Sequence, residues 1–318
     1  MNKGCNILFI GGGGFIGFNI IKYLASSHHN IFVYEPIFVN LDKFSELDSD
    51  VTIIRGTLTD TDTIESALNV YKINVLVHLV SSLIPGSSFV DFEKEFDSVI
   101  APTSKLIKLC AEKKIKFVYF SSGGTIYGNC NLDKIGESTD LAPISYYGLS
   151  KQIMETNILF ESRKKSLDYL IMRPSNPFGP GQSLNGAQGL IAVILGKVLK
   201  GEPIQIWGDG SSIRDYIFIK DLCVLFAKLI DFDVKNDIIN IGSGVGYSVN
   251  EIIACVKNAL NINITTKYTA SRDADVFSVV LDVRKLQNYV GDVVLTPMED
   301  AIREFYDYSV HEKYGKYE

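Results

Sequence analysis

The sequence predicts an α/β protein in which a doubly wound parallel sheet is followed by a smaller C-terminal domain. Three observations support this fold class. Short apolar runs alternate with longer amphipathic stretches through the first half of the chain, which is typical of a parallel sheet covered by helices. Four consecutive glycines, residues 11–14, directly follow the first apolar run. Prolines and glycines crowd together near residue 174, where the helical periodicity ends.

The expected strands are short runs that are apolar on both faces, as strands buried between two layers of helices must be. In chain order they are residues 7–10, 31–34, 51–54, 75–80, 117–120 and 169–172. Helices are expected where apolar residues recur at helical spacing. In chain order these are residues 15–26, 63–71, 96–113, 147–160, 190–200, 221–229, 249–260 and 298–308.

The cluster of prolines and glycines that begins at Pro174 marks the expected domain boundary. The first domain is expected to comprise residues 1–173 together with about 219–241. The second, smaller domain is expected to comprise residues 174–218 and 242–318.

The composition is that of a globular protein. Of the 318 residues, 46% are hydrophobic and 21% are charged, and the formal net charge is −6. A chain this acidic has no overall electrostatic footprint for nucleic acid. No apolar run approaches the roughly 20 residues of a membrane span. We therefore expect neither nucleic acid nor a membrane as a partner.

The cysteines and histidines indicate neither disulfides nor a metal site. The five cysteines are scattered and contain no C-x-x-C pair, and the four histidines are dispersed along the chain. The apolar residues 7–10 lead into glycines instead of a signal-peptide cleavage site. We expect a reduced, cytoplasmic protein without a bound metal.

The segment from Gly11 to Gly17 fits both G-x-G-x-x-G and G-x-x-G-x-x-G, and it lies between a predicted strand and a predicted helix. Glycines allow a tight turn and a close approach of the backbone to a pyrophosphate, which the helix N-terminus then attracts. The next strand ends at Glu35, 18 residues beyond Gly17. A carboxylate there accepts the ribose hydroxyls of an adenosine and repels a 2′-phosphate, so that NAD is favoured over NADP. The pattern predicts a Rossmann-type sheet.

Tyr147 and Lys151 form a Tyr-x-x-x-Lys pair at the start of a predicted helix. Positions i and i+4 share one helix face, and an ammonium beside the phenol is expected to lower its pKa. The phenol then exchanges a proton with a substrate hydroxyl. Tyr216 and Lys220 have the same spacing, but the sequence around Tyr216 is typical of a strand, where four residues span roughly 13 Å.

Together these residues resemble the extended short-chain dehydrogenase/reductase family, and among its members the NAD-dependent nucleotide-sugar epimerases and dehydratases of the UDP-galactose/UDP-glucose 4-epimerase type. The similarity extends over nearly the whole chain. It is carried in order by the segments Gly11–Gly17, Ser121–Gly128, Tyr147 with Lys151, Arg173–Gln182, Arg214–Ile217 and Arg272 with Asp275.

The resemblance implies NAD-dependent epimerisation at carbon 4 of a UDP-hexose or UDP-N-acetylhexosamine through a transient 4-keto sugar. It implies that the first domain binds NAD and the second binds the nucleotide sugar. A small residue, Val279, stands near the position that admits the N-acetyl group in such enzymes. The family also pairs two helices of each subunit in a homodimer, which here are the predicted helices 96–113 and 147–160.

Site residues follow by position from the same resemblance. The catalytic residues are Tyr147, Lys151, Ser122 and Thr125. The residues that contact the cofactor are Gly11, Gly14, Phe15, Ile16, Gly17, Glu35, Thr57, Leu58, Leu79, Val80, Ser121, Tyr147, Lys151 and Pro174. The residues that contact the substrate are Asn176, Leu190, Gln205, Trp207, Arg214, Arg272 and Asp275.

One departure leaves alternatives open. Gly123 stands where the family often has a Ser or Thr that assists the tyrosine, so that Ser122 or Thr125 must take this role or the role is absent. A 4,6-dehydratase is disfavoured because Gly123-Gly124 replaces its Asp-Glu pair. Other nucleotide-sugar enzymes, such as a decarboxylase or a reductase, remain alternatives, as does a non-catalytic NAD-binding sensor.

Overall fold

The computed structural model describes residues 4–47, 50–186, 188–270 and 278–314. The chain divides into two compact units. The first comprises Met1–Gly128, Asp140–Arg173 and Cys223–Ile239. The second comprises Asn129–Thr139, Pro174–Leu222 and Asn240–Glu318. The segment 129–139, which precedes the helix with the Tyr-x-x-x-Lys pair, thus belongs to the second unit.

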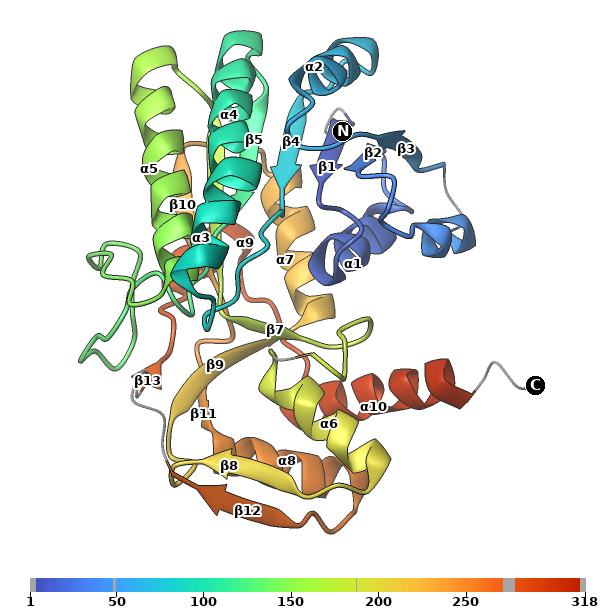
Figure 1. Cartoon of the computed structure of the whole chain (residues 1–318), viewed down its shortest axis with the longest axis vertical. Helices are drawn as coiled ribbons and strands as arrows, with labels where there is room; N and C mark the ends of the chain where they lie inside the picture. Colours follow the sequence, from blue (N-terminus) through green and yellow to red (C-terminus); the bar gives the residue numbers. More distant parts are fainter. Residues whose placement is uncertain (1–3, 48–49, 187, 271–277, 315–318) are drawn as a thin grey trace. The chain divides into compact units, whose positions relative to one another are not determined.

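A seven-stranded sheet forms the centre of the first unit, with the strand order β10-β6-β5-β4-β1-β2-β3 (Figure 1). Its strands are β1 (Asn6–Ile10), β2 (Asn30–Glu35), β3 (Thr52–Arg55), β4 (Val75–His78), β5 (Lys116–Phe120), β6 (Tyr169–Pro174) and β10 (Asp237–Ile241). Strands β1 to β6 pair in parallel. The order reverses between β1 and β4, and this switch point is where α/β sheets bind their ligands. The predicted doubly wound parallel sheet is confirmed.

Helices of the first unit connect these strands. They are α1 (Phe15–Leu24), α2 (Thr61–Val70), α3 (Phe89–Glu95), α4 (Ala101–Lys113), α5 (Tyr146–Lys165) and the part of α7 (Ile219–Asp231) from Cys223 onward, with a 3₁₀ turn at Asp42–Glu46. Side chains cap several N-termini and so satisfy backbone N–H groups that a helix leaves unpaired. Ser88 and Asp91 form a capping box at α3, and Ser145 accepts from the Gly148 amide at the start of α5.

The predicted helix 96–113 is wrong in one respect, because a π-helical turn, Phe96–Ile100, separates α3 from α4. Pro102 lies in the first turn of α4 and has no N–H to donate to the preceding turn. A missing hydrogen bond of this kind favours a local widening of the helix into a π turn. Such turns are frequent at functional sites. The predicted strand 75–80 is also shorter, because β4 ends at His78.

The core of the first unit lies between its sheet and the covering helices. Leu106 and Ile107 on α4 and Ile158 on α5 belong to one buried cluster with Phe117 of β5. Each such side chain contributes roughly 1.5–3 kcal/mol by leaving water. Helices α4 and α5 also contact each other (Figure 1). This packing fixes the helix that carries Tyr147 against the sheet.

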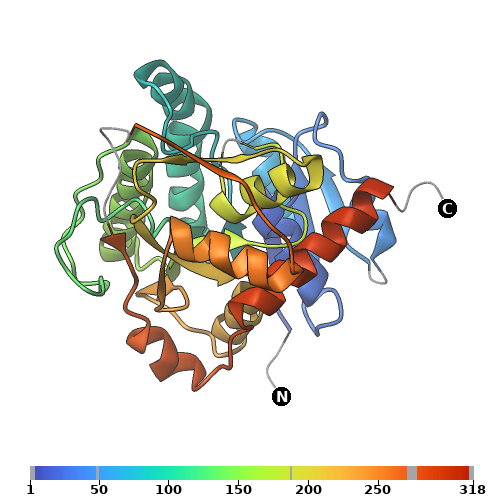
Figure 2. The same ribbon diagram turned by 90° about the horizontal axis from the view of Figure 1, so that it is seen from below.

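The second unit contains a four-stranded sheet in which β11, β13 and β7 pair with β9, and a two-stranded sheet of β8 and β12. Helix α8 packs against α10 (orange and red in Figures 1 and 2). The strands and helices of the second unit are β7 (Asn176–Phe178), α6 (Leu190–Lys200), β8 (Ile204–Trp207), β9 (Ile213–Phe218), β11 (Gly246–Ser248), α8 (Val249–Leu260), β12 (Thr266–Thr269), β13 (Ser278–Val279), α9 (Arg284–Val290) and α10 (Met298–Tyr314).

Asp215 is the polar centre of the second unit. It is fully buried on β9, and its carboxylate accepts hydrogen bonds from the Ser243 amide (2.9 Å), the Ser243 hydroxyl (2.8 Å), the Gly244 amide (3.0 Å) and the Leu281 amide (3.3 Å). A Cβ at Gly242 would lie 2.6 Å from the Asp215 carboxylate. Asp215 thus holds two loops onto the strand that carries Arg214.

The five cysteines, all of which lie within the described residues, form no disulfide. Within the described residues, no helix combines the length and the apolar character that crossing a bilayer requires.

Candidate active site

Tyr147 and Lys151 lie together on the first turns of α5. The Nζ of Lys151 is 5.4 Å from the centroid of the Tyr147 ring and 5.2 Å from that of Tyr119 on β5. It donates a hydrogen bond of 3.0 Å to the carbonyl oxygen of Phe120. Lys151 is buried. The predicted pair is therefore assembled at the carboxyl end of β5.

Two hydroxyl groups follow the Tyr147 phenol in a chain. Ser122 forms a side-chain hydrogen bond with Tyr147, and the Thr125 hydroxyl donates to Ser122 Oγ at 2.9 Å. Of the two candidates that sequence analysis leaves open for the role of the Gly123 position, Ser122 contacts the phenol and Thr125 supports Ser122.

The expected direction of the Tyr147 pKa is wrong for the structure as it stands. Desolvation by the surrounding protein raises the pKa of the phenol, the charge of Glu95 raises it further, and only the bond with Ser122 lowers it. Sequence analysis considered the ammonium of Lys151 alone. It had no signal for the burial of the hydroxyl or for a carboxylate that comes from another helix.

The pKa of Lys151 lies closer to neutral pH than that of an ordinary lysine. Burial lowers the pKa of its ammonium to about 8, while the charges of Glu95 and Glu155 raise it. The buried His78, at the end of β4, is held neutral, since desolvation and the charge of Lys151 lower its pKa to about 3. Its Nε2 is 2.9 Å from the Thr103 hydroxyl. Sequence reasoning missed the roles of Glu95, Glu155 and His78, because each comes from a position without a recognisable motif.

The glycine segment forms the turn between β1 and α1. Gly11 has φ +83°, which favours glycine. A Cβ at Gly17 would lie 2.7 Å from Gly12 Cα and 2.8 Å from the Gly12 carbonyl oxygen. At Gly14, in contrast, the nearest neighbour would be the Gly11 carbonyl oxygen at 3.6 Å. The loop is thus tightly packed on one side and open at the N-terminus of α1, where N–H groups attract phosphates.

Glu35 ends β2 beside this loop, and its Oε1 accepts a bond of 2.6 Å from the Gly13 amide. Burial raises the pKa of the carboxyl, and the cations Arg55 and Lys43 lower it. Lys43 Nζ donates to the Gly13 carbonyl oxygen at 2.7 Å. Sequence analysis missed these two cations, which the fold brings back to Glu35.

These residues fit a dinucleotide. Besides the open glycine turn, Ser121 Oγ at the end of β5 is buried without a hydrogen-bond partner in the part of the chain that the structure describes. Leu79 and Val80 follow β4, and a Cβ at Gly11 would meet both. The other predicted cofactor contacts lie as follows: Phe15 and Ile16 open α1, Thr57 and Leu58 follow β3, and Pro174 ends β6.

The predicted substrate residues lie in the second unit. Asn176 Nδ2 donates to the Asp215 carbonyl oxygen at 2.7 Å, and Arg214 Nη1 donates to that of Ile213 at 2.8 Å. Gln205 and Trp207 are both exposed on one face of β8. Leu190 begins α6, and Val279 is buried in β13. Arg272 and Asp275 lie outside the described residues.

The second Tyr-x-x-x-Lys match is not a pair, as predicted. Tyr216 lies in β9, and Lys220 forms an ion pair of 2.6 Å with Glu304. Because Lys220 lies in α7, which begins after β9 has ended, the two residues do not share one helix face.

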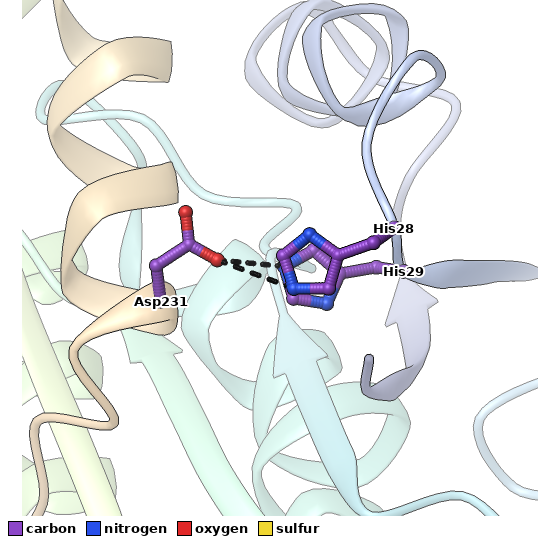
Figure 3. Close-up of side chains that lie close together, drawn as sticks. All are labelled: His28, His29 and Asp231. Atoms are coloured by element: carbon purple, nitrogen blue, oxygen red, sulfur yellow. Dashed lines mark hydrogen bonds and ion pairs between the residues drawn. The ribbon is translucent and has the colours of Figure 1, made fainter. Parts of the chain in front are cut away.

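His28, His29 and Asp231 form a cluster elsewhere in the first unit (Figure 3). The Nδ1 of His29 accepts a bond from the Cys5 amide, so its Nε2 carries the proton that it donates to Asp231 Oδ1 at 3.2 Å. A metal bound at Nε2 of His29 would require the ring proton to lie on Nδ1. That proton would face the Cys5 N–H, and the hydrogen bond from Cys5 would be lost. The fold brings Asp231 to the two histidines, which are neighbours in the sequence, and the hydrogen bonds favour a structural role.

Comparison with known proteins agrees with this geometry. The model of the NAD dependent epimerase/dehydratase family matches residues 7–242. A putative UDP-glucose 4-epimerase of Methanocaldococcus jannaschii is 28% identical over 89% of this chain and 91% of its own length. The dTDP-4-dehydro-6-deoxyglucose reductase of Escherichia coli is 27% identical over 93% and 95%.

Among solved structures, the UDP-glucose 4-epimerase of Thermotoga maritima with UDP-glucose is 25% identical. It superposes with a TM-score of 0.89 over 97% of this chain and 99% of that chain. The family match covers more than half of the chain and includes the glycine turn, Ser122, Tyr147 and Lys151. The chain therefore belongs to the NAD dependent epimerase/dehydratase family, and its cofactor is NAD.

Proposed function

We propose that the protein epimerises a UDP-hexose or UDP-N-acetylhexosamine at carbon 4 through a transient 4-keto sugar. The observation that carries this proposal is the grouping of Tyr147, Ser122 and Lys151 at the carboxyl end of β5. A pure NAD sensor has no use for a phenol that is linked to a hydroxyl chain and lies beside a buried ammonium.

The roles of the side chains follow from their chemistry. The Tyr147 phenolate removes the proton from the 4-hydroxyl, and the neutral phenol returns it to the 4-keto oxygen. The Ser122 hydroxyl donates a hydrogen bond to the phenolate and stabilises it, with Thr125 orienting Ser122. The Gly11–Gly17 turn and Glu35 would hold NAD, which would supply a reversible hydride acceptor for carbon 4 and a positive ring that favours the phenolate.

The second unit supplies candidates for holding the nucleotide. We propose that Arg214 and Arg272 bind the diphosphate with charge-assisted hydrogen bonds. Asn176 and Asp275 would hold the rest of the nucleotide, and Leu190, Gln205 and Trp207 would contact the base region. Trp207 is 44% exposed, and an indole ring is suited to stacking on a base.

A 4-ketoreductase is the second candidate. The raised pKa of Tyr147 favours the neutral phenol, which is the form that donates a proton to a 4-keto oxygen in a net reduction. The resemblance to a dTDP-4-dehydro-6-deoxyglucose reductase points to the same chemistry. A 4,6-dehydratase needs further acid and base groups, and Gly123-Gly124 offers none.

The test is turnover without added cofactor. Purified protein is incubated with UDP-glucose, UDP-galactose and their N-acetylated forms, and the 4-epimers are separated by chromatography. We expect epimer formation in wild type and in Tyr146→Phe, the matched control one residue away on α5, and none in Tyr147→Phe. Consumption of NADH with a 4-keto sugar and no epimerisation would indicate the reductase. Retained NAD without any turnover would leave the sensor.

We further propose a homodimer in which α4 and α5 of each subunit pair. These helices lie side by side, and Phe160 on α5 is 47% exposed. Light scattering of the purified chain tests this, because the sequence mass of 35.3 kDa corresponds to the monomer.

A further inference from the structure

Arg173, in the last turn of chain of β6, binds two separate parts of the first unit with one buried guanidinium. Its Nε and Nη2 donate to the Glu155 carboxylate on α5 at 2.9 and 2.5 Å. Its Nη1 donates to the Tyr127 hydroxyl at 2.9 Å. All three residues are at most 2% exposed. Because a guanidinium is planar and its donors are fixed relative to one another, these bonds set where Tyr127 lies relative to Glu155.

Tyr127 belongs to the segment that supplies the hydroxyl groups of the site. Residues 121–128 follow β5, and the Ile126 amide donates to the Ser122 carbonyl oxygen at 3.3 Å. The Thr125 hydroxyl donates to Ser122 Oγ at 2.9 Å. The segment is therefore a hydrogen-bonded turn, and a displacement of Tyr127 at its end would also move Ser122.

The same turn packs directly on the beginning of α5. A Cβ at Gly148, the neighbour of Tyr147, would lie 2.8 Å from the Thr125 carbonyl oxygen. A Cβ at Gly128 would collide with the carbonyl oxygen of Ala142, in the stretch that leads to α5. The two backbones meet without a side chain between them, so the position of the turn determines where its hydroxyl groups lie relative to the Tyr147 phenol.

We propose that Arg173 is a positioning residue, which aligns the Ser122 hydroxyl with Tyr147 by tying the turn to α5. Glu155 fixes the guanidinium on the helix, and Tyr127 transmits this position to the turn. The effect on turnover rests on the proposed function, whereas the tie itself is a property of the chain.

An ion pair alone does not require the bond to Tyr127. The Glu155 carboxylate already supplies the counter-charge, with one oxygen for each of two N–H donors. The Tyr127 hydroxyl adds a third fixed point to the guanidinium, and its contribution is therefore geometric. Tyr127→Phe isolates this contribution, because the ring, whose centroid is 5.0 Å from Arg173 Cζ, stays in place while the hydroxyl is lost.

The first test compares kcat of Tyr127→Phe and wild type with the UDP-sugar that is accepted. We expect kcat to fall by about 10-fold, a part of the roughly 100-fold that a well-placed proton-transfer group contributes, because Ser122 is present but misaligned. KM and the NAD content should not change. Tyr169→Phe, the matched control at a buried tyrosine of β6, should keep the wild-type kcat. An unchanged kcat in Tyr127→Phe would overturn the proposal.

Arg173→Lys tests the guanidinium itself. A lysine keeps the positive charge opposite Glu155 but lacks the planar fork that reaches both partners. It should lower kcat at least as much as Tyr127→Phe does, and Tyr127→Phe should cost nothing further when it is added to Arg173→Lys. A wild-type kcat in Arg173→Lys would overturn the proposal. If this variant does not fold, Tyr127→Phe keeps the proposal testable.

A double-mutant cycle separates positioning from a general loosening of the fold. If Tyr127 acts through Ser122, Tyr127→Phe should lower kcat on the wild-type background and have no further effect on the Ser122→Ala background. A merely structural role of Tyr127 would lower kcat by the same factor on both backgrounds, and that result would overturn the proposal.

Amide hydrogen exchange measures the tie without turnover. The Ile126 amide is bonded inside the turn, and its exchange, followed by NMR, should become about 10-fold faster in Tyr127→Phe because the turn opens more often. Tyr169→Phe should leave it unchanged. If wild type turns over no nucleotide sugar and this exchange still accelerates, the proposed function fails and the tie stands. If turnover is present and Tyr127→Phe changes neither kcat nor exchange, only the role of Arg173 fails.

Discussion

Arg173 and Glu155 form a bidentate ion pair inside the first unit, with Nε 2.9 Å from Oε1 and Nη2 2.5 Å from Oε2. Both residues are at most 2% exposed. Arg173 also donates to the Tyr127 hydroxyl at 2.9 Å. Because Glu155 lies one helical turn beyond Lys151, the pair ties the catalytic face of α5 to the end of β6.

Glu155→Gln should lower the free energy of unfolding by about 3–5 kcal/mol, because it leaves the buried guanidinium without a counter-charge. Glu112→Gln is the control, since Glu112 pairs with Lys165 at 2.5 Å on the surface, where such pairs contribute about 1 kcal/mol or less. Urea unfolding of both variants measures the difference. Equal losses would show that the Arg173 pair is no more important than a surface one.

Gly17→Ala should abolish retention of NAD. The new methyl group would press against the backbone of Gly12 in the turn itself, and a backbone collision of this kind cannot be relieved by a side-chain rotation. Gly136→Ala serves as the control, because a Cβ there meets nothing within 4 Å. The NAD content of the denatured proteins is measured by absorbance. Full retention in Gly17→Ala would argue against this turn as the cofactor site.

Ser122→Ala should reduce kcat by about 100-fold, within the usual range for proton-transfer groups. Thr125→Val should cost clearly less, because Thr125 reaches the phenol only through Ser122. NAD content should stay unchanged in both, and kcat is measured with the UDP-sugar that is accepted. A larger loss in Thr125→Val than in Ser122→Ala would reverse the assigned order.

Acid should destabilise the fold through His78. Its pKa of about 3 in the folded chain lies below the value of about 6.5 in an unfolded chain. Below pH 6.5 the unfolded state therefore binds a proton that the folded state refuses, and stability falls by up to about 1.4 kcal/mol per pH unit. His78→Gln lacks this titrating group and should not lose stability in this way. The difference between its free energy of unfolding and that of wild type should therefore shrink as the pH falls from 7.5 to 5. Urea midpoints that stay equally far apart at every pH would contradict the buried neutral imidazole.

Sequence patterns were sufficient for the sheet and the catalytic pair because both are local. The strands are continuous apolar runs, the glycine turn lies directly between a strand and a helix, and Tyr147 and Lys151 are four residues apart. Each of these signals involves residues that are close in the sequence. The periodicity of a helix or strand then determines which of these residues share one face of that element.

The environment of the site was not predictable in the same way. Glu95, Glu155 and Lys43 reach the site from separate elements, and their effect depends on burial that no single segment encodes. The sign of the Tyr147 pKa shift was wrong for this reason. The π-helical turn precedes Pro102, whose missing N–H favours such a turn and is a signal present in the sequence.

The most direct test of hydride cycling at carbon 4 uses the accepted UDP-sugar labelled with deuterium at that carbon. Purified protein converts it in ordinary water without added cofactor, and the epimer is examined by mass spectrometry and proton NMR. We expect the deuterium to remain at carbon 4 of the product, because the same hydride leaves and returns. Loss of the label to water would contradict the proposed reaction.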